Sequence, residues 1–176
     1  RTNPPAAATP DTRAPTGAGE ETLAIPDSLL DPIGLAYDSA SRRFVVGDRH
    51  ANKLIVADDV FKRVNDLIGA ESGGFGTLSG VAIDVRRGEL WERRNTVEGR
   101  ASLHKLQLVS GRVLSTLQVP DGLLPVTFAD VAIAESGSLL LVDSKGSRIW
   151  SVRNGAREFE RPIQLKLDHA VSIAAA

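Results

Sequence analysis

Three short apolar segments in the C-terminal part of the chain decide its fold. They are D-V-A-I-A (Asp130 to Ala134), S-L-L-L-V-D (Ser138 to Asp143) and S-R-I-W-S-V (Ser147 to Val152). Each has the length of one strand, and β-branched and aromatic residues favour extended structure. Glu135-Ser136-Gly137 separates the first two segments, and Arg153-Asn154-Gly155 follows the third. Because Asn-Gly accepts the positive φ of a tight hairpin turn, this stretch predicts consecutive antiparallel strands.

The same internal order occurs twice more upstream, and its beginning occurs once downstream. The upstream segments are Ile33 to Asp38, Arg43 to Asp48 and Asn52 to Asp58, then Gly80 to Asp84, Gly88 to Trp91 and Ser102 to Leu108. A fourth repeat begins at Ala170 to Ala174. Spacings of 46, 50 and 40 residues separate the aligned positions Leu35, Val81, Val131 and Val171. A four-stranded β-propeller blade takes roughly 40–50 residues. The chain is therefore predicted to be all-β, with about three antiparallel blades and the first strand of a fourth.

Fourth strands complete the predicted blades. They are expected at Val64 to Ile68, Arg112 to Leu117 and about Arg161 to Lys166. The window 59–69 also fits a helical period, and the repeat context favours the strand. A β-sandwich would not demand one repeated internal order, and an α/β fold needs longer helical windows between its strands. An arc of three blades leaves two terminal apolar faces that need cover.

The N-terminal region differs in composition from the rest of the chain. Residues 1–22 are rich in Pro, Ala, Thr and Gly, which predicts a flexible linker before a partial propeller domain at 23–176. The chain begins at Arg1 and contains no methionine, so we expect a segment of a longer protein. Linkers of this kind often follow an export signal, which slightly favours a periplasmic or extracellular location over a cloning remnant.

Charge and composition exclude several classes of function. The 21 basic and 22 acidic residues give a net charge of −1, which provides no electrostatic attraction for nucleic acid. No apolar run reaches the ~18 residues of a membrane span. The absence of cysteine excludes disulfides, thiolate catalysis and cysteine-ligated zinc.

Two parts of the repeats resemble a known group of propellers. P-I-G-L-A-Y-D (Pro32 to Asp38), V-V-G-D (Val45 to Asp48) and N-K-L-I-V (Asn52 to Val56) resemble one NHL unit. V-D-S-K-G-S-R-I-W (Val142 to Trp150) resembles the second half of the same unit. The chain is thus similar, over about residues 30–174, to the NHL-repeat and gluconolactonase (regucalcin-like) propellers. This resemblance implies part of a six-bladed ring.

The resemblance also implies a cofactor, a divalent cation such as calcium at the mouth of the central channel. Enzymes of the gluconolactonase type use a Glu, two Asn and an Asp as oxygen ligands, and the cation polarises a lactone carbonyl. Asp130 resembles the ligand Asp. Ile33 stands where the Glu is expected, and Ser79 or Gly80 stands near an Asn position. Asp130 is therefore a candidate calcium ligand, with hydrogen bonding to loop amides as the favoured alternative.

Polar groups after the second strands form a further set of candidates. We expect them in loops on one rim, where they could bind a ligand: Asp48, Arg49, His50, Glu92, Arg93, Asp143 and Lys145. Asp48 and Asp143 match positions that hydrogen-bond their own loop. Glu92 to Arg94, continuing through Asn95 to Arg100, are interpreted as a long charged loop. His50 could act as a base or a ligand, or simply be solvated.

The two remaining histidines have different interpretations. His104 alternates with Leu106 and Leu108, so it is expected to pack inside a blade, whereas His169 lies close to the position of Asp130 in the repeat.

Three functions remain open from the sequence. The first is a non-catalytic propeller that binds a small molecule or a protein through its channel-mouth loops. The second is a calcium-dependent lactone or ester hydrolase with Asp130 as one ligand. The third is a structural repeat scaffold. Two copies could also pair as a homodimer that closes a six-bladed ring.

Overall fold

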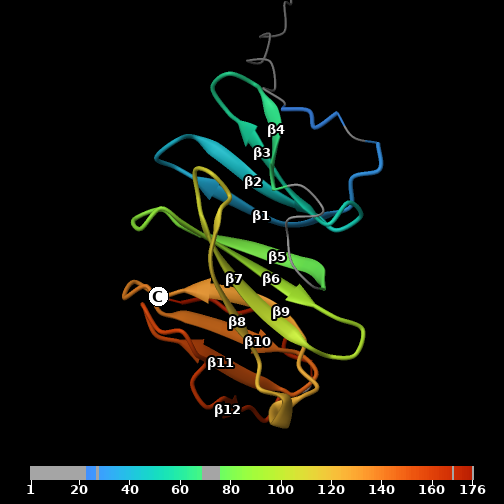
Figure 1. The fold of residues 1–176 in the computed structure, drawn as a ribbon, viewed down its shortest axis with the longest axis vertical. Coiled ribbons are helices and arrows are strands. Elements are labelled where there is room, and N and C mark those ends of the chain that lie inside the picture. The colour runs from blue at the N-terminus through green and yellow to red at the C-terminus, as the bar shows by residue number, and fades with distance from the viewer. Residues whose placement is uncertain (1–22, 27, 69–75, 168, 176) are drawn as a thin grey trace, which may run out of the picture.

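The computed structural model describes residues 23–26, 28–68, 76–167 and 169–175. The predicted linker at 1–22 lies outside these residues. Three four-stranded antiparallel sheets follow one another along the chain, each with its strands in sequence order. Figure 1 shows the three sheets stacked along the long axis of the molecule. The predicted arc of three propeller blades is confirmed.

Each blade is a meander of neighbouring strands. Blade 1 contains β1 (Pro32–Asp38), β2 (Arg43–Asp48), β3 (Lys53–Asp58) and β4 (Val64–Ile68). Blade 2 contains β5 (Thr77–Asp84), β6 (Glu89–Asn95), β7 (Ala101–Gln107) and β8 (Val113–Gln118). A short 3₁₀ turn, η1 (Asp121–Leu123), leads into blade 3. Blade 3 contains β9 (Phe128–Ile133), β10 (Leu139–Asp143), β11 (Arg148–Val152) and the two-residue β12 (Ile163–Gln164).

Alternating side chains on the strands build two separate apolar layers between the blades. Between blades 1 and 2 the buried side chains are Val45, Leu54, Ile68, Leu78, Leu90, Leu106 and Leu108. Between blades 2 and 3 they include Trp91, Leu103, Leu117, Phe128, Leu139, Leu141 and Trp150. Blade 2 therefore contributes one face to each layer, whereas blades 1 and 3 each contribute a face to one layer.

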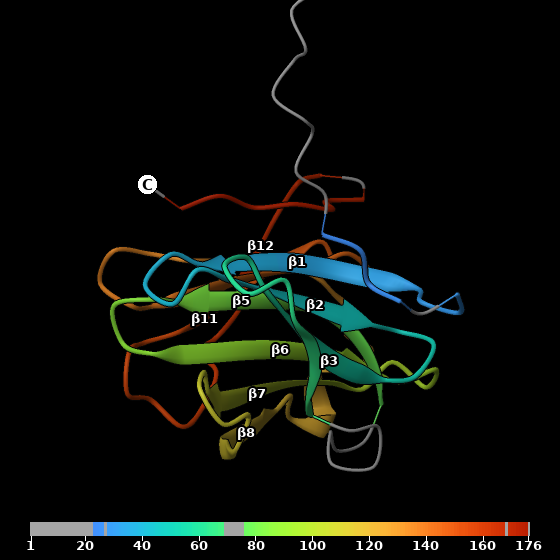
Figure 2. The same cartoon turned by 90° about the horizontal axis from the view of Figure 1, so that it is seen from above.

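The first strands of the blades contact one another in order, because β5 contacts both β1 and β9. Figure 2 shows β1 beside β5. Gly34 in β1 has a φ of 79°. A Cβ at this position would lie 2.9 Å from the backbone nitrogen of Val81 in β5. Only glycine combines this backbone angle with so close an approach, so Gly34 sets the spacing of the inner strands.

Among the described residues, one face of blade 1 is not covered by another blade. Val46 and Ile55 on this face are buried, and Ile25 and Pro26 of the N-terminal segment lie beside Ile55. Leu35 nevertheless stays 66% exposed. For this face, the arrangement agrees with the sequence expectation of an incompletely covered terminal face.

Two expectations about strands need correction. Residues 170–174 do not form the predicted first strand of a fourth blade. An inner strand is held by pairing with the second strand of its own blade, and the described residues contain no strand that pairs with 170–174. Strand β6 extends to Asn95, four residues beyond the predicted end at Trp91. The ambiguous window at 59–69 contains strand β4, as preferred. Within the described residues, no helix is long and apolar enough to cross a membrane.

Candidate functional site at the loop edge

One edge of the three blades carries most of the candidate residues. We call it the loop edge, and it is formed by the turns after the second strands together with the residues just before the inner strands. Backbone bonds join these parts: the Arg49 N–H donates to the carbonyl of Asp31, and the Ser144 N–H donates to that of Thr127. Asp48, Arg49, His50, Asp143 and Lys145 all lie at this edge, as the sequence predicted.

Asp48 and Asp143 tie the loop edge to the strands. One carboxylate oxygen of Asp48 accepts hydrogen bonds from the N–H groups of Asp31 and His50, at 3.1 and 3.0 Å. The Oδ1 atom of Asp143 accepts from the N–H groups of Thr127, Lys145 and Gly146. Both aspartates are fully buried. The predicted structural role of these two residues in their own loops is confirmed.

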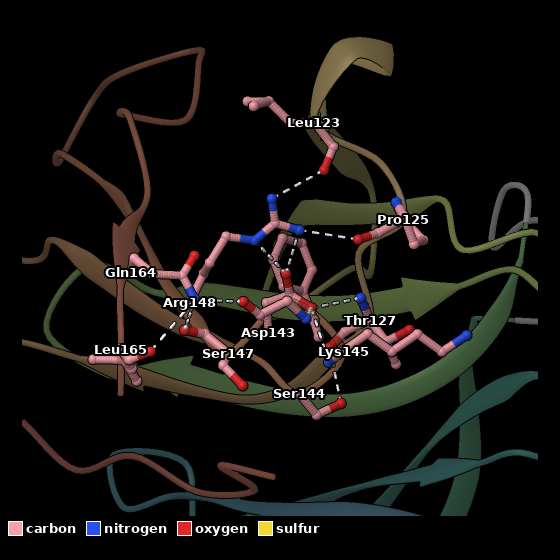
Figure 3. Close-up of polar contacts among 12 residues, drawn as sticks. Leu123, Pro125, Thr127, Asp143, Ser144, Lys145, Ser147, Arg148, Gln164 and Leu165 are labelled. Atoms are coloured by element: carbon pink, nitrogen blue, oxygen red, sulfur yellow. Dashed lines mark hydrogen bonds and ion pairs between the residues drawn. The ribbon is translucent and has the colours of Figure 1, made fainter. Parts of the chain in front are cut away.

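Asp143 has a second partner that the sequence did not reveal. The guanidinium of Arg148 lies against Oδ2 of Asp143, with Nε at 2.9 Å and Nη2 at 2.7 Å (Figure 3). The same guanidinium donates to the carbonyl oxygens of Leu123 and Pro125, at 3.1 and 2.9 Å. A planar fork of donors suits this arrangement. Arg148 thus joins β11 to the segment that enters blade 3.

Glu92, Arg93 and Arg94 are not in a loop, and this interpretation of the sequence was wrong. All three lie in β6 and are buried, with relative exposures of 1%, 6% and 1%. The pairing of Val81 with Glu92 matches that of Leu35 with Val46 and of Val131 with Leu141. Arg94 therefore occupies in blade 2 the place of Asp48 and Asp143.

Arg94 reverses the hydrogen bonding found in the other two blades. Its Nη1 donates to the carbonyl oxygen of Gly76, just before β5, at 3.1 Å. In blades 1 and 3 an aspartate accepts from a backbone N–H at that point. The Nε of Arg94 also donates to the carboxylate of Glu92, two residues earlier on the same strand face. Glu92 supplies the negative charge that a buried guanidinium requires.

His104 lies opposite Glu92 in the ladder between β6 and β7. Its Nε2 is 2.9 Å from the hydroxyl of Ser102, and its Nδ1 is 3.2 Å from the hydroxyl of Thr116. Burial and the charge of Arg94 lower the pKa of His104 to about 4. Burial raises the pKa of Glu92, although the bond from Arg94 acts in the opposite direction. His104 packs inside the blade as predicted, and its ring is neutral at pH 7.

Arg93 occupies the space between the inner strands β5 and β9. Its Nη1 donates to the carbonyl oxygen of Phe128 at 3.3 Å. Its guanidinium lies against Gly80, where any Cβ would collide with it. Desolvation lowers the pKa of Arg93, and the charge of Asp130 partly opposes this effect. Arg93 is thus a buried element of the interface between blades 2 and 3.

Asp130, the candidate calcium ligand, has both carboxylate oxygens engaged. Oδ1 accepts from the N–H of Val131 at 2.9 Å. Oδ2 accepts from the hydroxyl of Ser172 at 2.8 Å and the N–H of Ile173 at 3.0 Å. In the described part of the chain, no group of three or more His, Asp or Glu side chains could hold a metal ion. These contacts agree with the alternative that Asp130 binds loop amides. His169 has a φ of 56° and does not join Asp130 in any such group.

Two asparagines connect neighbouring blades, and the sequence interpretation missed the role of both. The side chain of Asn52 accepts from the N–H of Leu78 at 2.9 Å and donates to the carbonyl of Gly76 at 3.2 Å. Asn95 accepts from the N–H of Phe128 and donates to its carbonyl, both at 3.0 Å. Each amide therefore holds the start of the next inner strand. The sequence carried a signal for this role: two consecutive repeats each have an asparagine at the end of the second strand or in the turn that follows it.

The loop edge presents a few exposed side chains above this fixed base. Arg49, His50, Glu98 and Lys145 are exposed, and Arg49 forms a two-bond ion pair with Asp31 at 2.8 and 3.1 Å. The side chain of Val97 is 95% exposed.

The turn that carries Val97 is held by three hydrogen bonds. The Thr96 N–H donates to the Arg100 carbonyl, the Gly99 N–H donates to the Thr96 carbonyl, and the Arg100 N–H donates to the Thr96 hydroxyl. A hydrogen-bonded turn thus places an apolar side chain in solvent at the loop edge.

A small pocket lies next to this turn. It has a volume of about 220 Å³ and is lined by Thr96, Arg100, Ala101, Ser102, Gln118 and Val119. The guanidinium of Arg100 is paired with Asp121 at 2.6 Å. The lining therefore offers hydroxyl and amide groups with little net charge.

Comparisons with known proteins show the fold of this chain. No family model and no curated protein matches the sequence. Among solved structures, a chain of a nidogen/laminin complex matches with a TM-score of 0.66 and 19% identity, over 91% of this chain and 58% of that one. A streptogramin B lyase matches with a TM-score of 0.63 and 17% identity, over 86% and 46%. The β-propeller domain of Cps50 (Swd1) from Myceliophteria thermophila matches with a TM-score of 0.62 and 12% identity, over 84% and 45%.

This chain spans about half the length of each of those chains. Identities below 20% extend to the fold and not to an activity. The described residues form three blades of a β-propeller.

Proposed function

We propose that this chain is part of a propeller binding module and that its loop edge contacts a protein partner. The observation that carries the proposal is the Thr96–Arg100 turn, because it holds a 95% exposed valine on a hydrogen-bonded frame. Apolar side chains that are fixed before binding lose little conformational entropy when a partner covers them. His50 and Lys145 extend the same edge on blades 1 and 3.

The fixed base of the loop edge also supports this proposal. Asp48, Arg94 and Asp143 each fasten the segment before an inner strand, and Asn52 and Asn95 fasten one blade to the next. Rigid scaffolds that present loops are a common basis for recognition. We include in the proposal that the blades are of the NHL type and that the whole ring has six of them, on the motifs quoted above.

Photo-crosslinking tests the proposal. A photoreactive amino acid replaces Val97 in one variant and Val109 in a control variant. Val109 is a matched control because it is 70% exposed in a turn of the same blade, at the opposite edge. We expect extracts of the source organism to give a discrete crosslinked protein from position 97 only.

Reconstitution makes the result specific. The crosslinked protein, once identified and purified, should bind the unmodified chain, and Val97→Asp should weaken this binding at least about tenfold, which corresponds to about 1.4 kcal/mol. Equal crosslinking from both positions, or binding that is unchanged in Val97→Asp, would contradict a partner site at the loop edge.

A further inference from the structure

Ser102 and His104 form a hydrogen-bonded pair at the wall of the 220 Å³ pocket. They are two residues apart on β7, so their side chains project from the same face of the strand. Ser102 lines the pocket, whereas His104 is not among the lining residues and is only 6% exposed. A hydroxyl within reach of an imidazole nitrogen is the arrangement that activates serine nucleophiles.

Thr116 orients the imidazole from the neighbouring strand. It lies opposite His104 in the ladder between β7 and β8, and its Oγ1 is 3.2 Å from Nδ1. When Nδ1–H donates to Thr116, Nε2 keeps its lone pair toward the hydroxyl of Ser102. A base that is positioned by a third group completes the geometry of a nucleophile, a base and a positioning residue.

The charge around the pair determines the class of substrate. His104 is neutral at pH 7, so its Nε2 is free to accept a proton, and the low pKa of about 4 makes it a weak base. A weak base assists attack less than one with a pKa near 7, so an ester with a good leaving group is the substrate that suits this pair. Arg100 is neutralised by Asp121, which favours a neutral ester over a free anion. The volume of the pocket restricts the acyl group to a small one.

We propose that Ser102 is a nucleophile that accepts a small acyl group from an activated ester, with His104 as its base. The Oγ of Ser102 forms a bond to the acyl carbon while its proton moves to Nε2 of His104. The bond from the acyl carbon to the leaving oxygen then breaks, and the imidazolium returns the proton to that oxygen. In the second half of the cycle the oxygen of a water bonds to the acyl carbon, and the bond from that carbon to Oγ of Ser102 breaks. The carboxylic acid leaves, and the proton of the water passes through His104 to Ser102. This activity is independent of the partner site at Val97.

The test uses p-nitrophenyl acetate with the full chain at pH 7. We expect a burst of one p-nitrophenolate per chain, and mass spectrometry of peptides should locate one acetyl group on Ser102. Ser102→Ala should lose both the burst and this modification. His104→Gln should slow the burst at least about 100-fold, the usual contribution of a general base.

Two further variants keep the test decisive. Ser115→Ala removes a serine from β8 of the same blade outside the pocket lining, and it should acetylate like the original chain. Ser102→Thr keeps a hydroxyl if the alanine variant fails to fold, and it should be acetylated more slowly at position 102. Acetylation confined to lysines, or a burst that is equal in Ser102→Ala and the original chain, would overturn the proposal.

Discussion

Blades 2 and 3 have the same strand order, but the charged side chain buried at the end of the second strand is basic in blade 2 and acidic in blade 3. Blade 3 places Leu141 opposite Trp150 at the centre of its face and ends β10 with Asp143. Blade 2 places Glu92 opposite His104 at the same positions and has Arg94 where Asp143 stands. The repeated backbone therefore tolerates either sign, provided that the buried charge finds a partner.

The two blades also differ in which strand supplies the counter-ion of the buried charge. Asp143 takes its counter-charge from Arg148 on the next strand and leaves the centre of the face apolar. Arg94 takes its counter-charge from Glu92 on its own strand, so the centre of the face becomes polar. Blade 2 therefore has polar side chains where blade 3 has apolar ones. The pocket lined by Ser102 lies beside that polar centre.

The largest expected effect is the loss of the carboxylate in blade 3. Asp143→Ala removes the acceptor of three backbone N–H groups and leaves the guanidinium of Arg148 without its counter-ion. We expect the free energy of unfolding to fall by about 3–5 kcal/mol, as for other broken buried pairs. Urea denaturation followed by tryptophan fluorescence measures it, since Trp150 lies in the adjacent layer. A loss below about 1 kcal/mol would show that Asp143 does not hold the loop edge.

The next effect tests the substituted pair in blade 2. Arg94→Leu leaves the buried carboxylate of Glu92 without its partner and should cost about 3 kcal/mol. The double variant Glu92→Leu, Arg94→Leu restores the apolar centre found in blade 3. We expect it to recover at least half of that loss, because apolar residues often replace buried ion pairs at little cost. A double variant as unstable as Arg94→Leu would mean that the bond to Gly76, rather than the charge pair, dominates.

Acidification should act on blade 2 through His104. Its pKa of about 4 lies below the ordinary value of 6.5, so the unfolded chain binds the proton more readily. The stability from the neutral ring is complete above about pH 6.5 and is lost as the pH falls toward 4, to a limit of about 3 kcal/mol. The raised pKa of Glu92 acts in the opposite direction and offsets part of the loss.

Comparing variants isolates this effect from other titrating groups. We expect the difference in unfolding free energy between pH 7 and pH 4.5 to be smaller in His104→Leu than in the original chain by about 2 kcal/mol. The control variant is His50→Gln, which replaces a histidine with an exposed ring. Identical pH dependence in all three proteins would contradict the assignment of a neutral buried His104.

The repeat pattern predicted most of the fold because corresponding strands of the three blades share the same short pattern of apolar residues. Strands β2 and β4 have the predicted bounds, and turns flank β2 on both sides. The interpretation of Glu92 to Arg94 as a loop was wrong because a run of charged residues is usually exposed to solvent. The sequence of one strand also does not reveal which residues lie opposite it on the neighbouring strands. Their spacing carried a usable signal: residues two apart in a strand share a face, so Glu92 and Arg94 can pair.

The smallest expected effect compares blade 3 with blade 1. Lys53 occupies in blade 1 the ladder position that Arg148 occupies in blade 3, opposite Asp48 instead of Asp143. Arg148 spans Asp143 and two carbonyl oxygens, whereas the ammonium of Lys53 lies 3.2 Å from Asp66. The Oδ2 atom of Asp48 is buried without a hydrogen bond from the described residues. The two blades thus differ in whether a guanidinium donates to the Oδ2 atom of the buried aspartate.

Exchanging the two side chains tests this difference. Arg148→Lys should lower the free energy of unfolding by about 1–2 kcal/mol, because a single ammonium cannot reproduce the planar fork. Lys53→Arg should raise it by about 0.5 kcal/mol by donating to Oδ2 of Asp48. Urea denaturation of both single variants provides the measurement. If Lys53→Arg destabilises the chain, the ion pair of Lys53 with Asp66 contributes more to the stability of blade 1 than a hydrogen bond to Oδ2 of Asp48 does. An arginine at this ladder position would then stabilise blade 3 alone.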